Sequence, residues 1–426
     1  MDGQVYGMTT RAALRPAAFA LAYAACAFAA LAATSGEDGI AAVWPASGVF
    51  LAGLILLEGR QRHILLGGVA VASMAANLWV GVGILAAIGY TLANLAEGGI
   101  ALAVMRALGL RRQLFVAPRS FAIFVLAAFV AGLASAAMAG LLSGNGSRVF
   151  LSSWASTVIL GMLTVTPTIM FIANDRAGRS RLASLDGLLT LAITAALSAL
   201  AFGQSDLPLL FLPMAALSFA TFAVGLSGAA VAVVVVAAIG SVLTALNLGP
   251  VSVFLDATPD RVLFFQGYLF ALVVSVLPVA VLLARRQEDL ARIENSHRLL
   301  ELAERSARVG HWRFSLKDRQ IYWSAEALRV AGYPRDSRPT LDDALEIHLP
   351  EERERVSALV ALALREGLPF TYEARMRRAD GEIRVIECRA QVERDDTDTV
   401  IALFGTVVDV SRRTAPGNRG TRTVTA

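Results

Sequence analysis

The first two thirds of the chain consist of long apolar stretches separated by short polar segments, whereas the last third alternates apolar and charged positions over shorter distances. A run of about 20 apolar residues can cross the hydrocarbon core of a bilayer as a helix. Ten such runs precede Arg285, which predicts a multi-pass, all-α transmembrane helix bundle. We place the runs at residues 12–34, 40–57, 64–81, 84–105, 120–142, 149–173, 185–203, 207–225, 229–248 and 262–284.

The boundary between the eighth and ninth runs is less obvious than the others. Both lie in one uncharged stretch, Leu207 to Leu248, which is too long for a single crossing. The sequence GLSG at residues 225–228 contains two glycines, which permit a tight turn. We therefore divide the stretch there.

Residues 285–309 are predicted to form a helix that links the two regions. The apolar residues Leu283, Leu290, Ile293, Leu300 and Ala307 lie at positions that fit a three-and-four spacing, with successive separations of 7, 3, 7 and 7 residues. A helix with this pattern has one apolar stripe and can pair with a second copy of itself. His297 interrupts the stripe. A buried imidazole there would respond to pH, whereas an exposed one is an ordinary solvated side chain.

Beyond the linker, short segments of alternating bulky and polar residues predict strands. We expect them at residues 310–316, 320–324, 370–377, 382–391 and 400–410. Ser324 is placed to cap a helix that runs through Ala331. Pro350, followed by two glutamates, is typical of the first turn of a helix, which we extend to about Arg365. The sequence ADGE at residues 379–382 predicts a hairpin turn.

Composition agrees with a chain that is divided between two solvents. With 426 residues, 56% hydrophobic residues and a mean hydropathy of +0.60, the protein is too apolar for an ordinary soluble protein. Its two cysteines, Cys26 and Cys388, lie on opposite sides of the boundary, so we expect no structural disulfide. The net charge of +4 comes largely from arginines beside the apolar runs, which indicates membrane topology rather than nucleic-acid binding.

The arginines also predict the orientation of the bundle, because short cytoplasmic loops are rich in Lys and Arg. One side would receive Arg11, Arg15, Arg60, Arg62, Arg106, Arg111, Arg112, Arg119, Arg176, Arg179, Arg181, Arg285 and Arg286. The other side would receive only Arg148 and Arg261, together with several acidic residues. Both termini are therefore expected in the cytoplasm. Alternatively, the first run is a cleaved signal peptide, which leaves the orientation of the rest unchanged.

A few polar residues lie inside the predicted spans and are the candidate binding residues of the bundle. A charge inside the bilayer costs about 2.5 kcal/mol or more and usually marks function, which draws attention to Glu97. Asn94 lies one turn earlier on the same helical face, and Asn77 is in the preceding span. In the second span, Trp44 and Pro45 begin a segment in which Pro could kink the helix near a ligand. The simpler alternative is that these side chains only hydrogen-bond one helix to another.

These motifs resemble a known family. The sequence WPASG at 44–48, Ala76-Asn77, NLAEG at 94–98, and the spacing of Trp154, Gly161 and Pro167 resemble the membrane-associated sensor domain (MASE) of the first type. The resemblance covers most of residues 12–284 and implies an integral-membrane input module of bacterial signalling proteins. One position departs from it: Val158 stands where the family commonly has an acidic residue.

The C-terminal part resembles a PAS domain. The resemblance rests on WSAEALRVAGY, FTYEARMRRADGEIR and FGTVVDVSRR, covers residues 306–413, and implies a five-stranded antiparallel sheet with helices on one face. Such sheets commonly cradle a ligand or mediate dimers. Two positions depart from the family, LPEE at 349–352 and Val385-Ile386, and neither is expected to alter the fold.

Evidence for a cofactor in this domain is weak. Cys388 lacks the surroundings of the cysteine in flavin-binding light sensors, and we interpret it as a small core or surface residue. His348 would be a haem ligand only in the less common case, since a lone histidine is usually hydrogen-bonded within the structure. Trp312 and Trp323 could enclose a ligand, although a role as core or dimer-contact aromatic residues explains them more simply. The sequence requires no cofactor and indicates no metal site.

The sequence also contains no P-loop, GGDEF-type loop or kinase ATP lid, and we assign no catalytic residues. The predicted organisation is a cytoplasmic N-terminus (1–11), a membrane sensor (12–284), a signalling helix (285–309), a PAS domain (310–413) and a disordered tail (414–426).

We expect an inner-membrane sensor that relays an unknown stimulus through Leu290, Ile293, His297 and Leu300 of the linker to the PAS domain. The expected partners are the bilayer, a second copy of the chain and a separate kinase or cyclase. Two alternatives stay open. One is an ion- or proton-coupled transporter that uses Glu97, although the bundle shows no convincing internal repeat. The other is a truncated histidine kinase or diguanylate cyclase without its catalytic domain.

Overall fold

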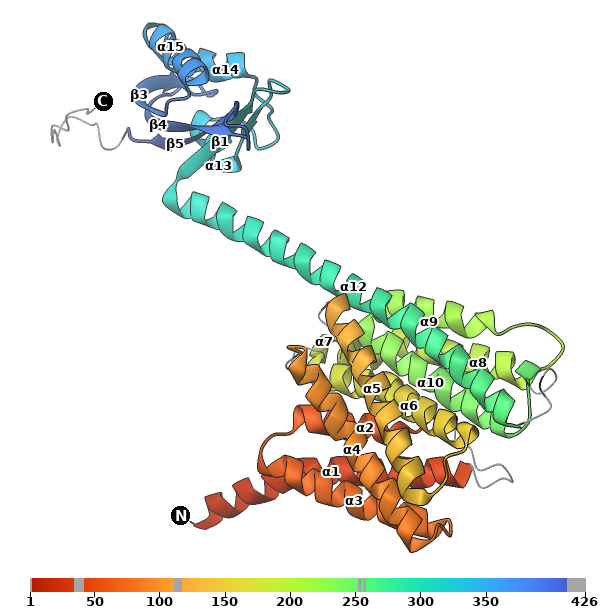
Figure 1. The fold of residues 1–426 in the computed structure, drawn as a ribbon. Helices are drawn as coiled ribbons and strands as arrows, with labels where there is room; N and C mark the ends of the chain where they lie inside the picture. Colours follow the sequence, from red (N-terminus) through yellow and green to blue (C-terminus); the bar gives the residue numbers. More distant parts are fainter. Residues whose placement is uncertain (1, 34–41, 111–116, 252–254, 256–257, 412–426) are drawn as a thin grey trace. The chain divides into compact units, whose positions relative to one another are not determined.

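The computed structural model describes residues 2–33, 42–110, 117–251, 255 and 258–411, and in helix α1 it describes side chains from Leu14 onward. The chain divides into two compact units, Met1–Glu288 and Asp289–Ala426. The first is a bundle of helices and the second contains a β-sheet (Figure 1). The predicted disordered tail at 414–426 lies outside the described residues.

Each of the ten predicted apolar runs corresponds to a helix of the first unit. The helices are α1 (Asp2–Ala33), α2 (Pro45–Leu56), α3 (Arg60–Trp79), α4 (Ile84–Ala107), α5 (Pro118–Ser143), α6 (Arg148–Asn174), α8 (Leu185–Gly203), α9 (Phe211–Ala223), α10 (Leu226–Ala245) and α12 (Thr258–Ala307). Among the described residues, seven helices are long and apolar enough to cross a membrane. The predicted division of the long uncharged stretch is confirmed, because α9 ends and α10 begins around Gly225, whose φ of 86° suits glycine.

In the first unit, two of the predicted spans are shorter than expected, and one described helix was not predicted. Helix α2 has 12 residues and α9 has 13, so α2 is about 18 Å long, against a hydrocarbon core of about 30 Å. Helix α2 starts at Pro45. Proline has no backbone N–H, and this costs nothing in the first turn of a helix because N–H groups there have no partner within the helix. The prediction that Pro45 kinks the second span is therefore wrong, because Pro45 begins the helix. The unpredicted helix is α7 (Arg176–Leu182), which Asp175 caps through the Gly178 amide.

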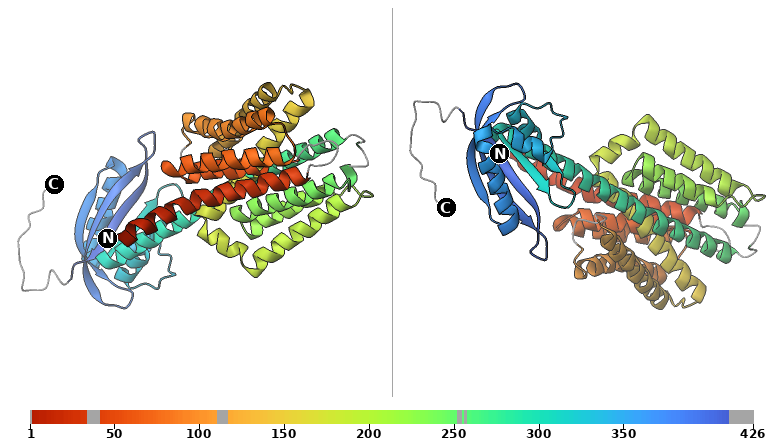
Figure 2. Two further views of the ribbon diagram at one scale, coloured as in Figure 1. Left: turned by 90° about the horizontal axis from the view of Figure 1, so that it is seen from below. Right: turned by 90° about the horizontal axis from the view of Figure 1, so that it is seen from above.

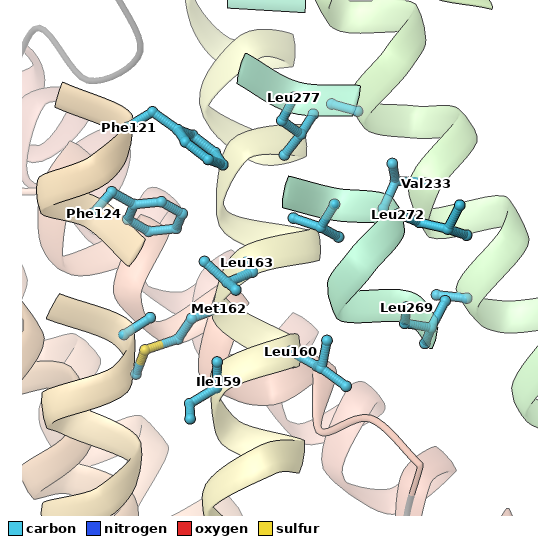
Figure 3. Close-up of a cluster of buried hydrophobic side chains, with 14 of the residues drawn as sticks. Phe121, Phe124, Ile159, Leu160, Met162, Leu163, Val233, Leu269, Leu272 and Leu277 are labelled. Carbon is cyan, nitrogen blue, oxygen red and sulfur yellow. The ribbon is translucent and has the colours of Figure 1, made fainter. Parts of the chain in front are cut away.

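Helix α6 is the central element of the bundle. It contacts α2, α5 and α10. Figure 3 shows α6 residues Ile159, Leu160, Met162 and Leu163 between the phenylalanines of α5 and the leucines of α12. A second core joins α1, α2 and α3, and α1 lies along α3 (Figure 2). Val158, the departure from the MASE pattern, is 2% exposed and belongs to the central core.

The start of α2 packs backbone to backbone against α6. The Trp44 amide donates a hydrogen bond to the Thr157 carbonyl at 3.1 Å, and the Thr166 hydroxyl donates to the Gly48 carbonyl at 3.1 Å. A Cβ on Gly161 would lie 1.9 Å from the Trp44 carbonyl oxygen, and one on Gly48 would lie 2.2 Å from the Gly161 carbonyl oxygen. Only glycine permits this approach at either position.

Helix α12 is continuous for 50 residues and contains the predicted linker helix except for its last two residues, because α12 ends at Ala307 and β1 begins at Val309. Its apolar stripe is uncovered in the single chain: Leu290, Ile293 and Leu300 are 56%, 59% and 57% exposed. His297 is also exposed. Pro278 lies within the membrane part of α12.

The second unit is an antiparallel sheet of five strands in the order β2-β1-β5-β4-β3. The strands are β1 (Val309–Ser315), β2 (Ile321–Trp323), β3 (Phe370–Arg377), β4 (Ile383–Arg394) and β5 (Val400–Asp409), close to the predicted segments. Helices α13 (Ala325–Ala331), α14 (Leu341–Glu346) and α15 (Pro350–Glu366) complete the unit. Alternate residues of β3 and β4, such as Ala374 and Cys388, face α15 through Val356. The predicted α+β fold is confirmed.

Helix α14 was not predicted, because it has only six residues and none of them is buried. It begins with a capping box between Thr340 and Asp343. The LPEE departure lies at the start of α15, where Pro350 takes the first helical position and Glu351 and Glu352 the first turn. The fold therefore accepts this segment as expected.

The contact between α2 and α6 predicts a strong sensitivity to substitution. We expect Gly161→Ala to lower the stability of the bundle by about 1–3 kcal/mol or more, because the new methyl group forces the two backbones apart. The melting temperature of the purified protein in nanodiscs measures the effect. Gly99→Ala in α4 is the matched control, since a Cβ there meets no described atom within 4 Å. Equal melting temperatures for the two variants would contradict the close contact.

Candidate functional site

Glu97 of α4 lies at the centre of a polar cluster that is buried between helices α1 to α6. Its side chain is 0% exposed. One carboxyl oxygen, Oε2, accepts a hydrogen bond from the Ser135 hydroxyl of α5 at 3.4 Å, and Ser135 in turn accepts one from Trp154 Nε1 of α6 at 2.9 Å. Among the described residues, no basic side chain forms an ion pair with Glu97. The hydrogen bond to its carboxyl group therefore comes from the Ser135 hydroxyl, which also lies 3.2 Å from the Ala93 carbonyl.

A second part of the cluster is centred on Ser73 of α3. Its hydroxyl oxygen lies 3.0 Å from Asn94 Nδ2 and 3.2 Å from the Thr91 hydroxyl, both in α4. Asn77 instead donates to the Ser73 carbonyl of its own helix at 2.9 Å. Asn94 therefore links two helices, which fits the simpler of the two alternatives left open for these polar residues, whereas Asn77 bonds within α3.

Several polar atoms of this cluster have no hydrogen-bond partner among the described residues. They are the Tyr23 hydroxyl, Trp44 Nε1, the Ser47 hydroxyl and Glu97 Oε1. Tyr23 lies close to Ser73, Trp44 and Asn94, and Ser47 lies close to the Glu97 carboxyl, but none of these approaches has the geometry of a hydrogen bond. Each unpaired buried polar group costs about 1–3 kcal/mol, so together they destabilise the bundle unless something satisfies them. Water or a small polar ligand that both donates and accepts hydrogen bonds would do so.

The structure brings together three of the five membrane residues that the sequence suggested: Trp44, Asn94 and Glu97. Pro45 positions Trp44 by starting α2, and Asn77 is at the edge of the cluster. Sequence reasoning missed Tyr23, Ser47, Ser73, Thr91 and Ser135. Serine, threonine and tyrosine are too common in membrane helices to stand out singly. Ser73 lies four residues before Asn77 on the same helical face, which is the one available signal.

A further buried polar residue connects this region to α12. Gln266 of α12 is 3% exposed. Its side-chain oxygen accepts a hydrogen bond from the Ser156 hydroxyl of α6 at 2.7 Å, and its amide donates to the Ala42 carbonyl at 3.2 Å. Ala42 is two residues before Trp44. Gln266 was also missed, although it is a lone amide in an otherwise apolar span.

The second candidate site is an apolar cavity of about 70 Å³ inside the PAS unit. The three residues suggested by the sequence, Trp312, Trp323 and His348, all line it, and Tyr372 and Cys388 form part of its wall. A cavity of about 150 Å³ holds benzene. As it stands, this cavity therefore fits a ligand of a few heavy atoms.

Both ring nitrogens of His348 in the cavity wall have hydrogen-bond partners, whereas Trp323 Nε1 has none among the described residues. His348 is 4% exposed. Its Nε2 lies 3.1 Å from the Tyr372 hydroxyl and its Nδ1 lies 3.2 Å from the Leu345 carbonyl. Burial lowers the pKa of His348 and raises the pKa of Tyr372 well above its usual value. Burial also raises the pKa of Cys388 to about 11, so its thiol stays protonated near neutral pH.

His348 should make the PAS unit less stable in acid. Its pKa is lower in the folded than in the unfolded state, so the unfolded chain binds more protons and stability falls as the pH drops below about 6.5. We expect His348→Gln to weaken this pH dependence and to cost about 1–3 kcal/mol at pH 7, because the buried Tyr372 hydroxyl is left poorly paired. Hydrogen exchange of the β3 and β4 amides between pH 7 and pH 5 measures both effects.

The control for this experiment is His297→Gln, which changes an exposed histidine of the linker. It should retain the full pH dependence of the PAS unit. An unchanged pH dependence in His348→Gln would show that another group is responsible for the acid sensitivity.

Comparisons with known proteins agree with this division of the chain. A profile described as MASE1 matches residues 14–288, and a profile described as PAS fold matches residues 320–407. No curated protein matches the chain.

Solved structures also match part of the chain. One is a sensory box histidine kinase/response regulator from Burkholderia thailandensis E264, with 26% identity, coverage of 27% of this chain and 86% of that chain, and a TM-score of 0.24. Another is the N-terminal domain of a diguanylate cyclase with PAS/PAC sensor from Marinobacter aquaeolei, with 24% identity, coverage of 25% and 97%, and a TM-score of 0.24.

The MASE1 match spans well over half of the 426 residues. Together with the apolar helices, it identifies an integral membrane protein with a C-terminal PAS domain. The chain belongs to the MASE1 family.

Proposed function

We propose that this protein is a signal-transducing sensor of the bacterial inner membrane, in which the polar cluster around Glu97 registers the stimulus. Helix α12 transmits the change to the PAS domain, and the PAS domain acts on a separate signalling protein such as a kinase or cyclase. Both termini lie in the cytoplasm, as the arginine distribution favours.

The observation that carries this proposal is the group of unpaired polar atoms around Glu97. These atoms come from three helices: Tyr23 is in α1, Ser47 is in α2 and Glu97 is in α4, and Trp44 directly precedes α2. A stable bundle that served only as an anchor would gain by replacing them with apolar residues. A ligand or water that pairs with them favours one arrangement of these helices over another. That difference in affinity is what a sensor requires.

A continuous set of contacts leads from this cluster to the output helix. Trp44 belongs to the cluster, and its backbone is fixed against α6 at Thr157 and Gly161. Gln266 of α12 bonds to α6 through Ser156 and to Ala42 just before Trp44. A shift of the α2 start would therefore act on α12 through these hydrogen bonds and the close contact at Gly161.

The exposed stripe of α12 supports pairing between two copies of the chain. Leu290, Ile293 and Leu300 are each more than half exposed in the single chain, and a second copy of the helix would cover them. Two paired helices can convert a small rotation or shift into a change at the PAS domains. In this proposal His297 faces the pair, and the PAS cavity adjusts the response by binding a small ligand.

A cross-linking experiment tests the proposed sensing and pairing together. In a background without Cys26 and Cys388, we expect Ile293→Cys to form disulfide-linked dimers in membranes faster than Arg292→Cys, whose side chain is off the stripe. Adding Glu97→Gln should change the cross-linking rate at position 293 by about fivefold or more, a typical size for coupling between sites.

The control is Thr194→Val in α8. Thr194 is 1% exposed, and among the described residues its hydroxyl donates a hydrogen bond to the Thr190 carbonyl of the same helix. It should leave the rate unchanged. Equal rates at positions 292 and 293 would rule out the pairing, and an unchanged rate in Glu97→Gln would rule out the sensing role. Proton flux into liposomes that Glu97→Gln abolishes would instead identify a transporter.

Gln266 provides a separate test of the route through α12. We expect Gln266→Leu to remove most of the effect of Glu97→Gln on cross-linking at position 293, because the hydrogen bonds to Ser156 and Ala42 are lost. The double-mutant cycle measures this as non-additivity. Additive effects would mean that the cluster acts on the linker by another route.

A further inference from the structure

The second unit also has a surface pocket, which shares no lining residue with the apolar cavity described above. It has a volume of about 550 Å³ and lies between the end of α12, helix α13 and the loop that follows α13. Four arginines line it together with a tyrosine, one acidic residue and one alanine: Arg305, Arg308, Arg329, Arg335, Tyr333, Glu326 and Ala325. A volume of this size is typical of small-molecule sites.

The single acidic residue of the pocket is already neutralised. Glu326 is 4% exposed, and Arg329 donates to both of its carboxyl oxygens, at 2.8 Å and 2.5 Å. Arg335 has Glu301 at 3.8 Å, with both side chains more than half exposed, and a pair of this kind contributes little. Within the described residues, Arg305 and Arg308 form no ion pair. Three guanidinium groups thus face one pocket with almost no compensating charge.

The backbone of Arg308 adds a second, independent observation. Arg308 directly follows the last residue of α12 and has a φ of 54°. Glycine is the usual residue in this left-handed conformation after a helix, because a side chain there is strained. The carbonyl groups at the helix end favour a nearby cation. That preference accounts for arginines at the end of α12, where Arg305 and Arg308 lie. It does not account for Arg335, which is in the loop after α13.

Tyr333 supplies an aromatic surface beside the arginines. Its ring packs edge-on against Trp323, with ring centroids 6.0 Å apart and an interplanar angle of 86°. It is half-buried and is held in one orientation by this contact. A fixed aromatic ring next to several guanidinium groups suits a ligand that joins a planar ring to negative charge.

We propose that this pocket binds a small anion with two or more phosphate groups, of the size of a nucleotide. Arg305, Arg308 and Arg335 bind the phosphates, since guanidinium groups match phosphate oxygens in pairs, and Tyr333 stacks on the base. The ligand would join the end of α12 to α13. Binding here is independent of the role proposed for Glu97.

Binding by the full-length protein in nanodiscs of neutral lipid tests the proposal. Microscale thermophoresis with ATP and with inorganic triphosphate, both without Mg²⁺, should show binding that weakens as salt increases. We expect Arg305→Gln and Arg308→Gln each to weaken both ligands by about tenfold or more. Tyr333→Leu should weaken ATP and leave triphosphate unchanged.

The matched control is Arg365→Gln at the end of α15, where the arginine is exposed and paired with Glu366 at 3.0 Å. It should leave both affinities unchanged. Absence of binding, or equal effects of the pocket and control variants, would overturn the proposal. Binding of the nanodisc-embedded protein to vesicles with phosphatidylserine, but not to ATP or triphosphate, would overturn it as well by identifying a lipid headgroup as the ligand.

Discussion

The close contact between the start of α2 and the middle of α6 determines where the polar groups of the bundle lie. Because Gly161 and Gly48 have no side chains, the two backbones approach until a Cβ would not fit. This contact holds Trp44 and Ser47 next to Glu97, and it leaves their polar atoms with no partner in the described protein. The same residues therefore combine a rigid backbone contact with unsatisfied polar side chains. Rigid support for a destabilised group is a common property of functional sites.

Much of the fold follows from the sequence because the two solvents impose different periodicities. In a bilayer the backbone must satisfy its own hydrogen bonds, so long apolar runs become helices, and ten runs were recognisable. In water the sheet alternates buried and exposed residues, as in β3, where Tyr372, Ala374 and Met376 are buried. Short elements were missed for a physical reason. Helices such as α7 and α14 are stabilised by capping groups at Asp175 and Thr340 and bury little apolar surface, so they produce no periodic pattern.

The candidate sites were predictable only in part. Glu97 and Asn94 stood out because charge and amide groups are rare inside a membrane. Ser73 and Ser135 did not, since their importance depends on which helices become neighbours: Ser135 is 38 residues from Glu97 in the chain. In the PAS unit, His348 was interpreted as a hydrogen-bonded structural residue, and its contacts with Tyr372 and Leu345 are of that kind. Its position in the cavity wall required the three-dimensional structure.

Pro278 makes α12 easier to bend at one position. Because proline has no N–H, the carbonyl of Val274 receives no hydrogen bond from the residue four positions later. This turn lies between Gln266, where α12 is bonded to α6, and Arg285, where the apolar part of the helix ends. If α12 is displaced at Gln266, the part of the helix after Pro278 would therefore tilt relative to the part before it, and would also rotate about the helix axis.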